Sequence, residues 1–159
     1  MTDDTGTGEF LHISSDDLTD TSDWFAAPDE TLQMIASHAD FVGVGPELTL
    51  IMSGTLVSGE VISIVDFYRG AAAAIREATA DVPVMGEGAD NFARLVFDRP
   101  AEFHASRPKN ATNTPIEMTR YLHLGNVTIQ TPAGIVNTQR LRVLLARVSA
   151  WYLGRPLYS

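Results

Sequence analysis

Residues 48–80, LTLIMSGTLVSGEVISIVDFYRGAAAAIREATA, decide the fold, because two hydrophobic periods follow each other in this stretch without a break. Residues 48–62 are rich in the side chains that favour strands. Ser53-Gly54 in their middle supplies the positive φ that a tight hairpin needs. The stretch is therefore predicted to begin with two antiparallel strands joined by a short turn.

A helical period begins at Ser63 and continues for four turns. Apolar side chains recur there at three- and four-residue spacing, at Ile64, Phe67, Tyr68, Ala71, Ile75 and Ala78. Ser63 and Asp66 form a pattern close to a capping box, so the helix is predicted to start at Ser63. Pro83 disfavours helical conformation in the residue before it, and the helix is predicted to end there. A hairpin that runs into an amphipathic helix is half of a small α+β core.

Length and composition predict one folded domain with an acidic arm in front of it. A chain of 159 residues is long enough to bury a core without disulfides or metal. Residues 1–23 are expected to form a flexible arm, because their small apolar surface cannot offset the entropy of ordering them. Within the arm, Phe10, Leu11 and Ile13 are candidate contact residues. Residues 24–159 are expected to form a single α+β domain.

Several kinds of chemistry are excluded by the composition. The absence of cysteine excludes disulfides, thiolate zinc sites, iron–sulfur clusters and cysteine nucleophiles. The four histidines are widely scattered, and no G-x-S-x-G motif is present. We therefore expect no catalytic, cofactor or metal site, and no enzyme. No secretion signal or apolar run of about 18 residues is visible, so a cytoplasmic protein without membrane contact is predicted.

Charge is distributed unevenly along the chain, whose net charge is −9. Residues 1–66 contain thirteen acids and no lysine or arginine, whereas residues 118–159 contain five arginines and no acid. The two ends therefore attract each other within one molecule or between neighbours, although a solvated acidic tail has the same composition. An acidic chain repels polyanions, so nucleic acid is not an expected partner. The candidate interaction residues near the C-terminus are Arg140, Arg142, Arg147, Trp151 and Tyr152.

The remaining elements are a helix before the hairpin and strands at the end of the chain. Pro28-Asp29-Glu30 opens a helix over about 29–39. Residues 83–117 are punctuated by glycine and proline and are expected to form a loop-rich, irregular insert, in which 91–97 fits a helix or a strand. Residues 118–129 predict two strands with a turn at Gly125-Asn126, and 141–148 predict another strand. This order favours an α+β fold with a small antiparallel sheet, or a partly closed SH3- or Sm-like barrel, and two packed helices.

Three motifs occur in an order that resembles a known family: VSGEVIS at 57–63, LHLGN at 122–126, and Arg147 followed by WYLG at 151–154. Over about half its length the chain resembles the GvpU-like gas vesicle accessory proteins. The resemblance implies a non-catalytic role in the assembly, clustering or surface state of gas vesicles, through weak protein–protein contacts. It also implies the vesicle shell or other accessory proteins as partners, with self-association as a further possibility.

A second resemblance concerns the fold alone. The segment GTLVSGEV at 54–61 is similar to the hairpin of Sm-like small barrels. The Asp-x-x-x-Asn that Sm-like proteins use to bind an RNA base is absent, because Asp66 enters a helix instead. The alternative function is therefore a small-barrel module, unrelated to gas vesicles, that binds another protein or RNA.

Overall fold

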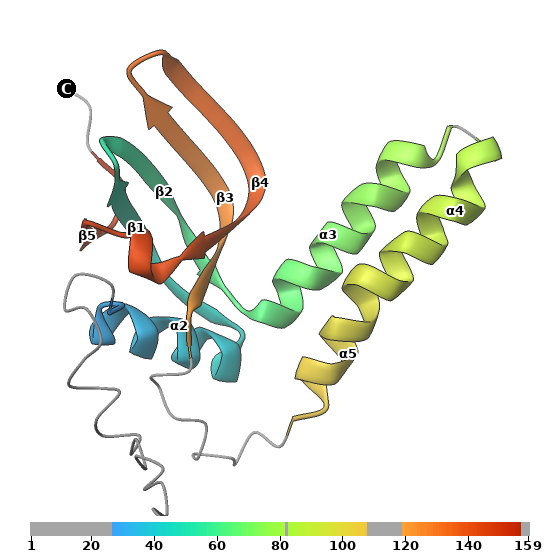
Figure 1. Cartoon of the computed structure of the whole chain (residues 1–159), viewed down its shortest axis with the longest axis horizontal. Helices are drawn as coiled ribbons and strands as arrows, with labels where there is room; N and C mark the ends of the chain where they lie inside the picture. The colour runs from blue at the N-terminus through green and yellow to red at the C-terminus, as the bar shows by residue number, and fades with distance from the viewer. Residues whose placement is uncertain (1–26, 82, 108–118, 157–159) are drawn as a thin grey trace, which may run out of the picture.

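The computed structural model describes residues 27–81, 83–107 and 119–156 (Figure 1). Their helices and strands in chain order are α2 (Glu30–Val42), β1 (Val44–Met52), β2 (Thr55–Ile62), α3 (Ile64–Thr79), α4 (Pro83–Ala93), the π-helical η1 (Arg94–Asp98), α5 (Arg99–Ala105), β3 (Tyr121–Thr131), β4 (Gly134–Leu144), the 3-10 helix η3 (Leu145–Arg147) and β5 (Ala150–Leu153).

The predicted hairpin is confirmed. β1 and β2 pair antiparallel, with Met52 opposite Thr55. Ser53 and Gly54 between them have φ of 49° and 78°. Two consecutive residues with positive φ form the kind of turn whose twist matches that of the flanking strands.

The five strands form one antiparallel sheet in the order β4-β3-β2-β1-β5. This confirms an α+β fold with a small antiparallel sheet. The described strands do not close into a barrel, because β4 and β5 are the edges of the sheet and do not pair with each other. The sheet is strongly curled, so that the β3–β4 hairpin bends over β2 (Figure 1).

The helix α2 confirms the prediction for 29–39 and extends it to Val42. Asp29 is the N-cap, and its carboxylate accepts a hydrogen bond of 3.0 Å from the Leu32 amide. Gly43 ends the helix with φ of 96°. Buried side chains of α2 pack on the sheet, and together they make the hydrophobic core: Leu32, Ala36, Ala39, Leu48, Leu50, Val57, Val61, Leu122, Leu124, Val127, Val143 and Leu145.

The helix α3 begins where its cap predicts. The Asp66 amide donates to Ser63 Oγ over 3.0 Å, and the Ser63 hydroxyl donates to the Asp66 carboxylate over 2.8 Å. The carboxylate of Asp40, near the end of α2, accepts from the Ile64 amide over 2.6 Å. From this end of the sheet, α3 extends away from it and runs beside α4 and α5 (Figure 1). The protein therefore has two parts, a curled sheet closed by α2 and a helical hairpin.

The expectation of an irregular insert is wrong for residues 83–105, which are helical. Residues 91–97, whose sequence fits either a helix or a strand, are helical and lie in α4 and η1. Pro100 explains the π turn. Proline has no amide hydrogen to donate to the Val96 carbonyl, and its ring crowds that carbonyl. The preceding amide, that of Arg99, donates to the Arg94 carbonyl five residues back, which is the π-helical pattern. We call the continuous helical segment made of α4, η1 and α5 the rod. Arg76 joins α3 to the rod by pairing with Asp90 at 2.7 Å and Asp98 at 2.6 Å. Residues 108–117 lie outside the described part.

Two predictions about the last strands are also wrong. The turn expected at Gly125-Asn126 does not occur, because β3 runs unbroken from Tyr121 to Thr131. Asn126 has φ of 50°, and the β2–β3 register shifts there, so that two residues of β3 lie opposite Gly59. The predicted strand at 141–148 begins earlier, at Gly134, and gives way to η3 after Leu144. The positive φ of Asn126 thus serves a β-bulge in β3, opposite Gly59 of β2, and not a turn.

Candidate interaction surfaces

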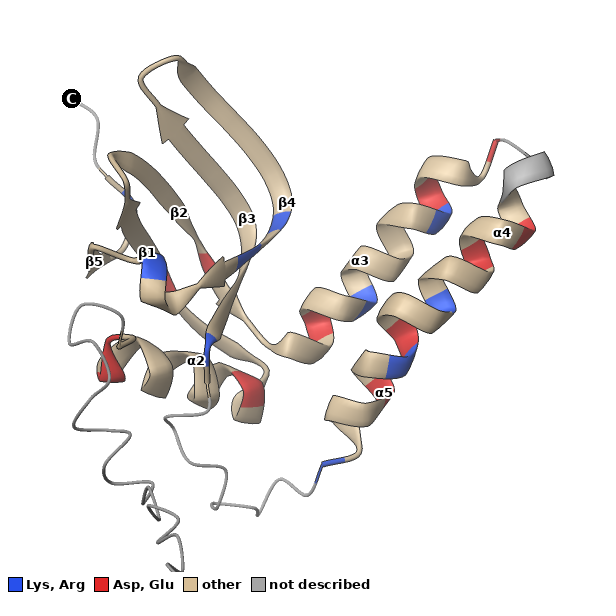
Figure 2. Cartoon of the chain, viewed as in Figure 1, with Lys and Arg blue, Asp and Glu red and all other residues tan. Residues whose placement is uncertain are grey.

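The structure separates the predicted interaction residues into three groups. Phe10, Leu11 and Ile13 lie outside the described residues. Arg140 and Arg142 lie on β4, and Arg147 lies in η3, where Figure 2 shows basic positions without acidic neighbours on the same strands. On β5, Trp151 packs against the core and Tyr152 is exposed. Arg140 and Arg142 are therefore brought together, while Trp151 is chiefly a core residue.

Arg140 and Arg142 point toward the face of the sheet that carries the helical hairpin. Arg142 lies opposite His123 in the β3–β4 register, and Arg140 lies opposite Gly125. The Arg142 guanidinium stacks over the Tyr121 ring at 3.8 Å, a cation–π contact. The Arg140 guanidinium occupies the space above Gly70, where a Cβ would lie 1.8 Å from Nε. These arginines therefore contribute to the joint between sheet and hairpin.

Aromatic rings fill the rest of this joint. The rings of Phe67 and His123 lie 4.8 Å apart, and those of Tyr68 and His104 lie 6.1 Å apart. His123 is 4% exposed, and its Nε2 has no hydrogen-bond partner among the described atoms. Burial, with the charge of Arg142 as a second cause, lowers the pKa of His123 to about 4. Burial also lowers the pKa of His104, so both imidazoles are neutral at pH 7.

A concave groove lies inside the curl of the sheet. We use this name for the hollow of about 520 Å³ that is lined by Met52, Ser53, Thr55, Val57, Leu141, Arg142, Val143, Leu144 and Arg147. β2 and β4 both line it although β3 lies between them, since the sheet is curled. We call its apolar lining residues the floor; Arg142 and Arg147 add positive charge to the lining, and Arg147 makes no ion pair with any described residue. The groove thus joins apolar surface to unpaired positive charge.

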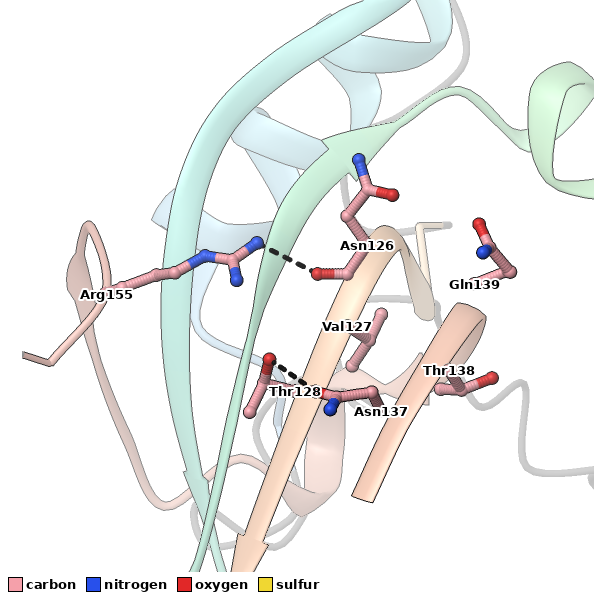
Figure 3. Close-up of a pocket in the computed structure, with 7 residues that line it drawn as sticks. All are labelled: Asn126, Val127, Thr128, Asn137, Thr138, Gln139 and Arg155. Atoms are coloured by element: carbon pink, nitrogen blue, oxygen red, sulfur yellow. Dashed lines mark hydrogen bonds between the residues drawn. The ribbon is translucent and has the colours of Figure 1, made fainter. Parts of the chain in front are cut away.

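A smaller polar hollow of about 300 Å³ lies between β3, β4 and the end of the chain (Figure 3). Thr128 donates to the Asn137 side-chain oxygen over 3.0 Å, and Arg155 donates to the Asn126 carbonyl over 2.9 Å. Arg155 also pairs with Glu47. Apart from Arg155, the side chains that line the hollow are uncharged, so the hollow offers hydrogen bonds but no pair of groups for acid–base chemistry.

Exposed apolar side chains on the helical hairpin were not identified from the sequence. We call Phe92, Leu95, Val96 and Phe103 the outer face; their exposed fractions are 51%, 50%, 42% and 60%. Ala93 and Ala101, on the other side of the same rod, are buried. The three- and four-residue spacing of the first three was visible in the sequence, but it became informative only once the segment was known to be helical.

The described residues offer neither a metal-binding cluster nor a membrane-spanning helix. None of these residues forms a group of three or more His, Cys, Asp or Glu side chains that is able to hold a metal ion. No described helix combines the length and the apolar character required to cross a membrane.

Fold and surfaces define a small α+β protein in which a curled five-stranded sheet carries a helical hairpin. Residues 29–156 match the family described as Gas vesicle protein GvpU-like, and the chain belongs to this family. The match includes every described helix and strand. A search of curated proteins returned no similar sequence. The resemblance carried by the three sequence motifs is thereby confirmed, and the protein is a gas vesicle accessory protein.

Proposed function

We propose that this protein acts without catalysis, through weak protein–protein contacts that modulate the assembly, clustering or surface interactions of gas vesicles. The family match supports the setting, since it covers residues 29–156. The partners in this proposal are the vesicle shell or other accessory proteins, with self-association as part of the same behaviour. The proposal places the protein in the cytoplasm, in association with gas vesicles.

The observation that carries this proposal is the outer face of the helical hairpin. Its four side chains are large, apolar and about half exposed, and they follow one another along a single rod. A cluster of exposed apolar side chains on one element is typical of a contact site for another protein. Cationic Arg107 lies over the Phe103 ring at 5.1 Å and adds positive charge at the end of this face. The outer face therefore suits a partner surface that is chiefly apolar.

Co-flotation with purified vesicles tests the proposal, because gas-filled compartments rise on centrifugation and carry bound protein with them. We expect the full chain to float with vesicles and Leu95→Ser/Val96→Ser to bind about tenfold more weakly, as two half-exposed apolar side chains are lost from the contact. Met34→Ser is the matched control, since Met34 on α2 is 51% exposed. The proposal is contradicted if the wild type and both variants float equally, or if the wild type does not float with vesicles.

A further inference from the structure

The concave groove and the N-terminal segment have matching chemistry. The apolar floor of the groove includes Leu141 together with Val57 and Val143, which are almost fully buried, and Arg142 and Arg147 also line the groove. Its volume of about 520 Å³ lies within the range of roughly 300–1,000 Å³ that is usual for ligand pockets. A short apolar segment with acidic neighbours is therefore the kind of occupant that fits.

Residues 1–26, which precede the described part, contain such a segment. They carry seven acids and no lysine or arginine, and FLHI at 10–13 is their densest apolar cluster before residue 24. Glu9 stands directly before this cluster, and Asp16 and Asp17 follow it closely. The apolar side chains match the floor of the groove, and the acids match the charge of Arg147.

The segment is long enough to reach the groove of its own chain. The described structure begins at residue 27, and the 17 residues from Phe10 to that point span up to roughly 60 Å when extended. That reach exceeds the length of β3 or β4, each of which has 11 residues and spans roughly 37 Å. Binding within one molecule also avoids the loss of translational freedom that association of two chains costs.

The edge of β4 offers a way to hold an extended segment. Among the described strands, β4 pairs only with β3, so one edge of its backbone carries unpaired amides and carbonyls. A segment that adds to a sheet edge directs alternate side chains to the same side. Leu11 and Ile13 are two residues apart, so in an added strand both would be directed to the same side.

We propose that residues 10–13 dock in the concave groove of the same molecule, with Leu11 and Ile13 on its apolar floor and the neighbouring acids beside Arg147. The arm thereby covers the edge of β4 and neutralises part of the basic surface of the sheet. This docking goes beyond the proposed function and does not depend on it. If docking fails, the outer face remains available to a vesicle partner.

Paramagnetic relaxation in the full chain tests the docking, and the cysteine-free sequence makes labelling simple. A nitroxide on Ser14→Cys is expected to broaden the NMR signals of Val57, Leu141 and Val143, with exposed Ala73 and Ala74 of α3 unaffected. The effect is expected to weaken at high salt, which screens the acids from Arg147. Broadening that is absent, or uniform over the whole domain, overturns the proposal.

Two sets of variants and one mixing experiment sharpen the test. Leu11→Ser/Ile13→Ser is expected to abolish the broadening, whereas Leu18→Ser, elsewhere in the arm, is expected to leave it. Arg147→Glu is expected to reduce it several-fold, and Arg99→Glu, an exposed arginine of α5, serves as the matched control. If the broadening is lost in a variant and also in its matched control, the assignment of the groove is overturned. In the mixing experiment, an isotope-labelled wild-type chain is combined with a spin-labelled chain that carries no isotope. If the signals of the wild-type chain broaden, the segment docks on a second copy, and docking within one molecule is overturned.

Discussion

The guanidinium of Arg140 on β4 lies over Gly70 of α3, so closely that a Cβ at Gly70 would come within 1.8 Å of Nε. This contact joins the edge of the sheet to the helical hairpin. Glycine inside a helix is unfavourable by about 0.5–1 kcal/mol relative to alanine, so its presence here needs a packing reason. The space that Arg140 occupies is such a reason.

A double-mutant cycle measures this contact. In a chain that carries Arg140→Ala, we expect Gly70→Ala to stabilise the protein by about 0.5–1 kcal/mol through helix propensity. With Arg140 present that gain is expected to disappear, because the methyl group displaces the guanidinium, giving a coupling energy of about 1 kcal/mol. Denaturant unfolding gives the four free energies.

Gly86 provides the control for this cycle. It lies in α4, and a Cβ there would meet no atom within 4 Å. Gly86→Ala is expected to stabilise the protein equally with and without Arg140. If Gly70→Ala behaves in the same way as Gly86→Ala in both backgrounds, Arg140 does not occupy the space above Gly70.

Local sequence signals account for most of the framework. Asp29 and Ser63 cap α2 and α3 as their positions predicted, and Ser53-Gly54 forms the turn between β1 and β2. Each of these features depends on a few adjacent residues, whose backbone preferences are intrinsic. Of the three motifs that resemble the GvpU-like family, the first lies in β2 and ends at the α3 cap, whereas the others lie in β3 and between η3 and Gly154.

The errors arose where contacts distant in the sequence decide the structure. The glycines and prolines of residues 83–105 favour loops, yet the segment is helical, with Ala93 and Ala101 buried and Asp98 paired with Arg76 of α3. Gly125-Asn126 has the chemistry of a turn, but pairing with β2 uses it as a bulge. The concave groove was not predictable either, since it depends on the curl of the whole sheet.

A buried hydroxyl pair links β5 to the rest of the sheet. Thr49, which is fully buried, donates to the Gly154 carbonyl over 2.6 Å and therefore accepts from the Ser58 hydroxyl over 2.9 Å. Thr49→Val leaves both of these groups without their partner, and we expect it to lower the free energy of unfolding by about 1–3 kcal/mol. Thr128→Val, which removes a hydroxyl from the edge of the polar hollow, is expected to cost less than about 0.5 kcal/mol. Similar losses in the two variants would mean that the Thr49 hydroxyl has no special role.

Stability is expected to fall in acid because of His123. Its pKa is about 4 in the folded chain, against an ordinary value of 6.5, so between these values the unfolded chain binds a proton that the folded chain does not. The resulting loss in the free energy of unfolding is nearly absent above pH 6.5 and grows as the pH falls, reaching about 3 kcal/mol near pH 4. His104, whose pKa is also lowered, acts in the same direction.

Replacing His123 with leucine isolates this effect. Nε2 lacks a partner, so His123→Leu is expected to be neutral or stabilising at pH 7. Between pH 7 and pH 4 the variant is expected to lose about 3 kcal/mol less than the wild type, as measured by chemical unfolding at each pH. His38→Gln, at an exposed position of α2, controls for the loss of a histidine. Parallel pH profiles for the wild type and His123→Leu would show that burial does not exclude the proton.

Photo-crosslinking on intact vesicles tests most directly the claim that the outer face contacts gas vesicles. Benzoylphenylalanine replaces Phe92 or Phe103 of the outer face, or Phe41 of α2 as a control of similar exposure, 53% against 51% and 60%. We predict crosslinks from positions 92 and 103 to a protein of the vesicle and none from position 41. Crosslinks from position 41 alone, or from no position although the chain floats with vesicles, would contradict the claim.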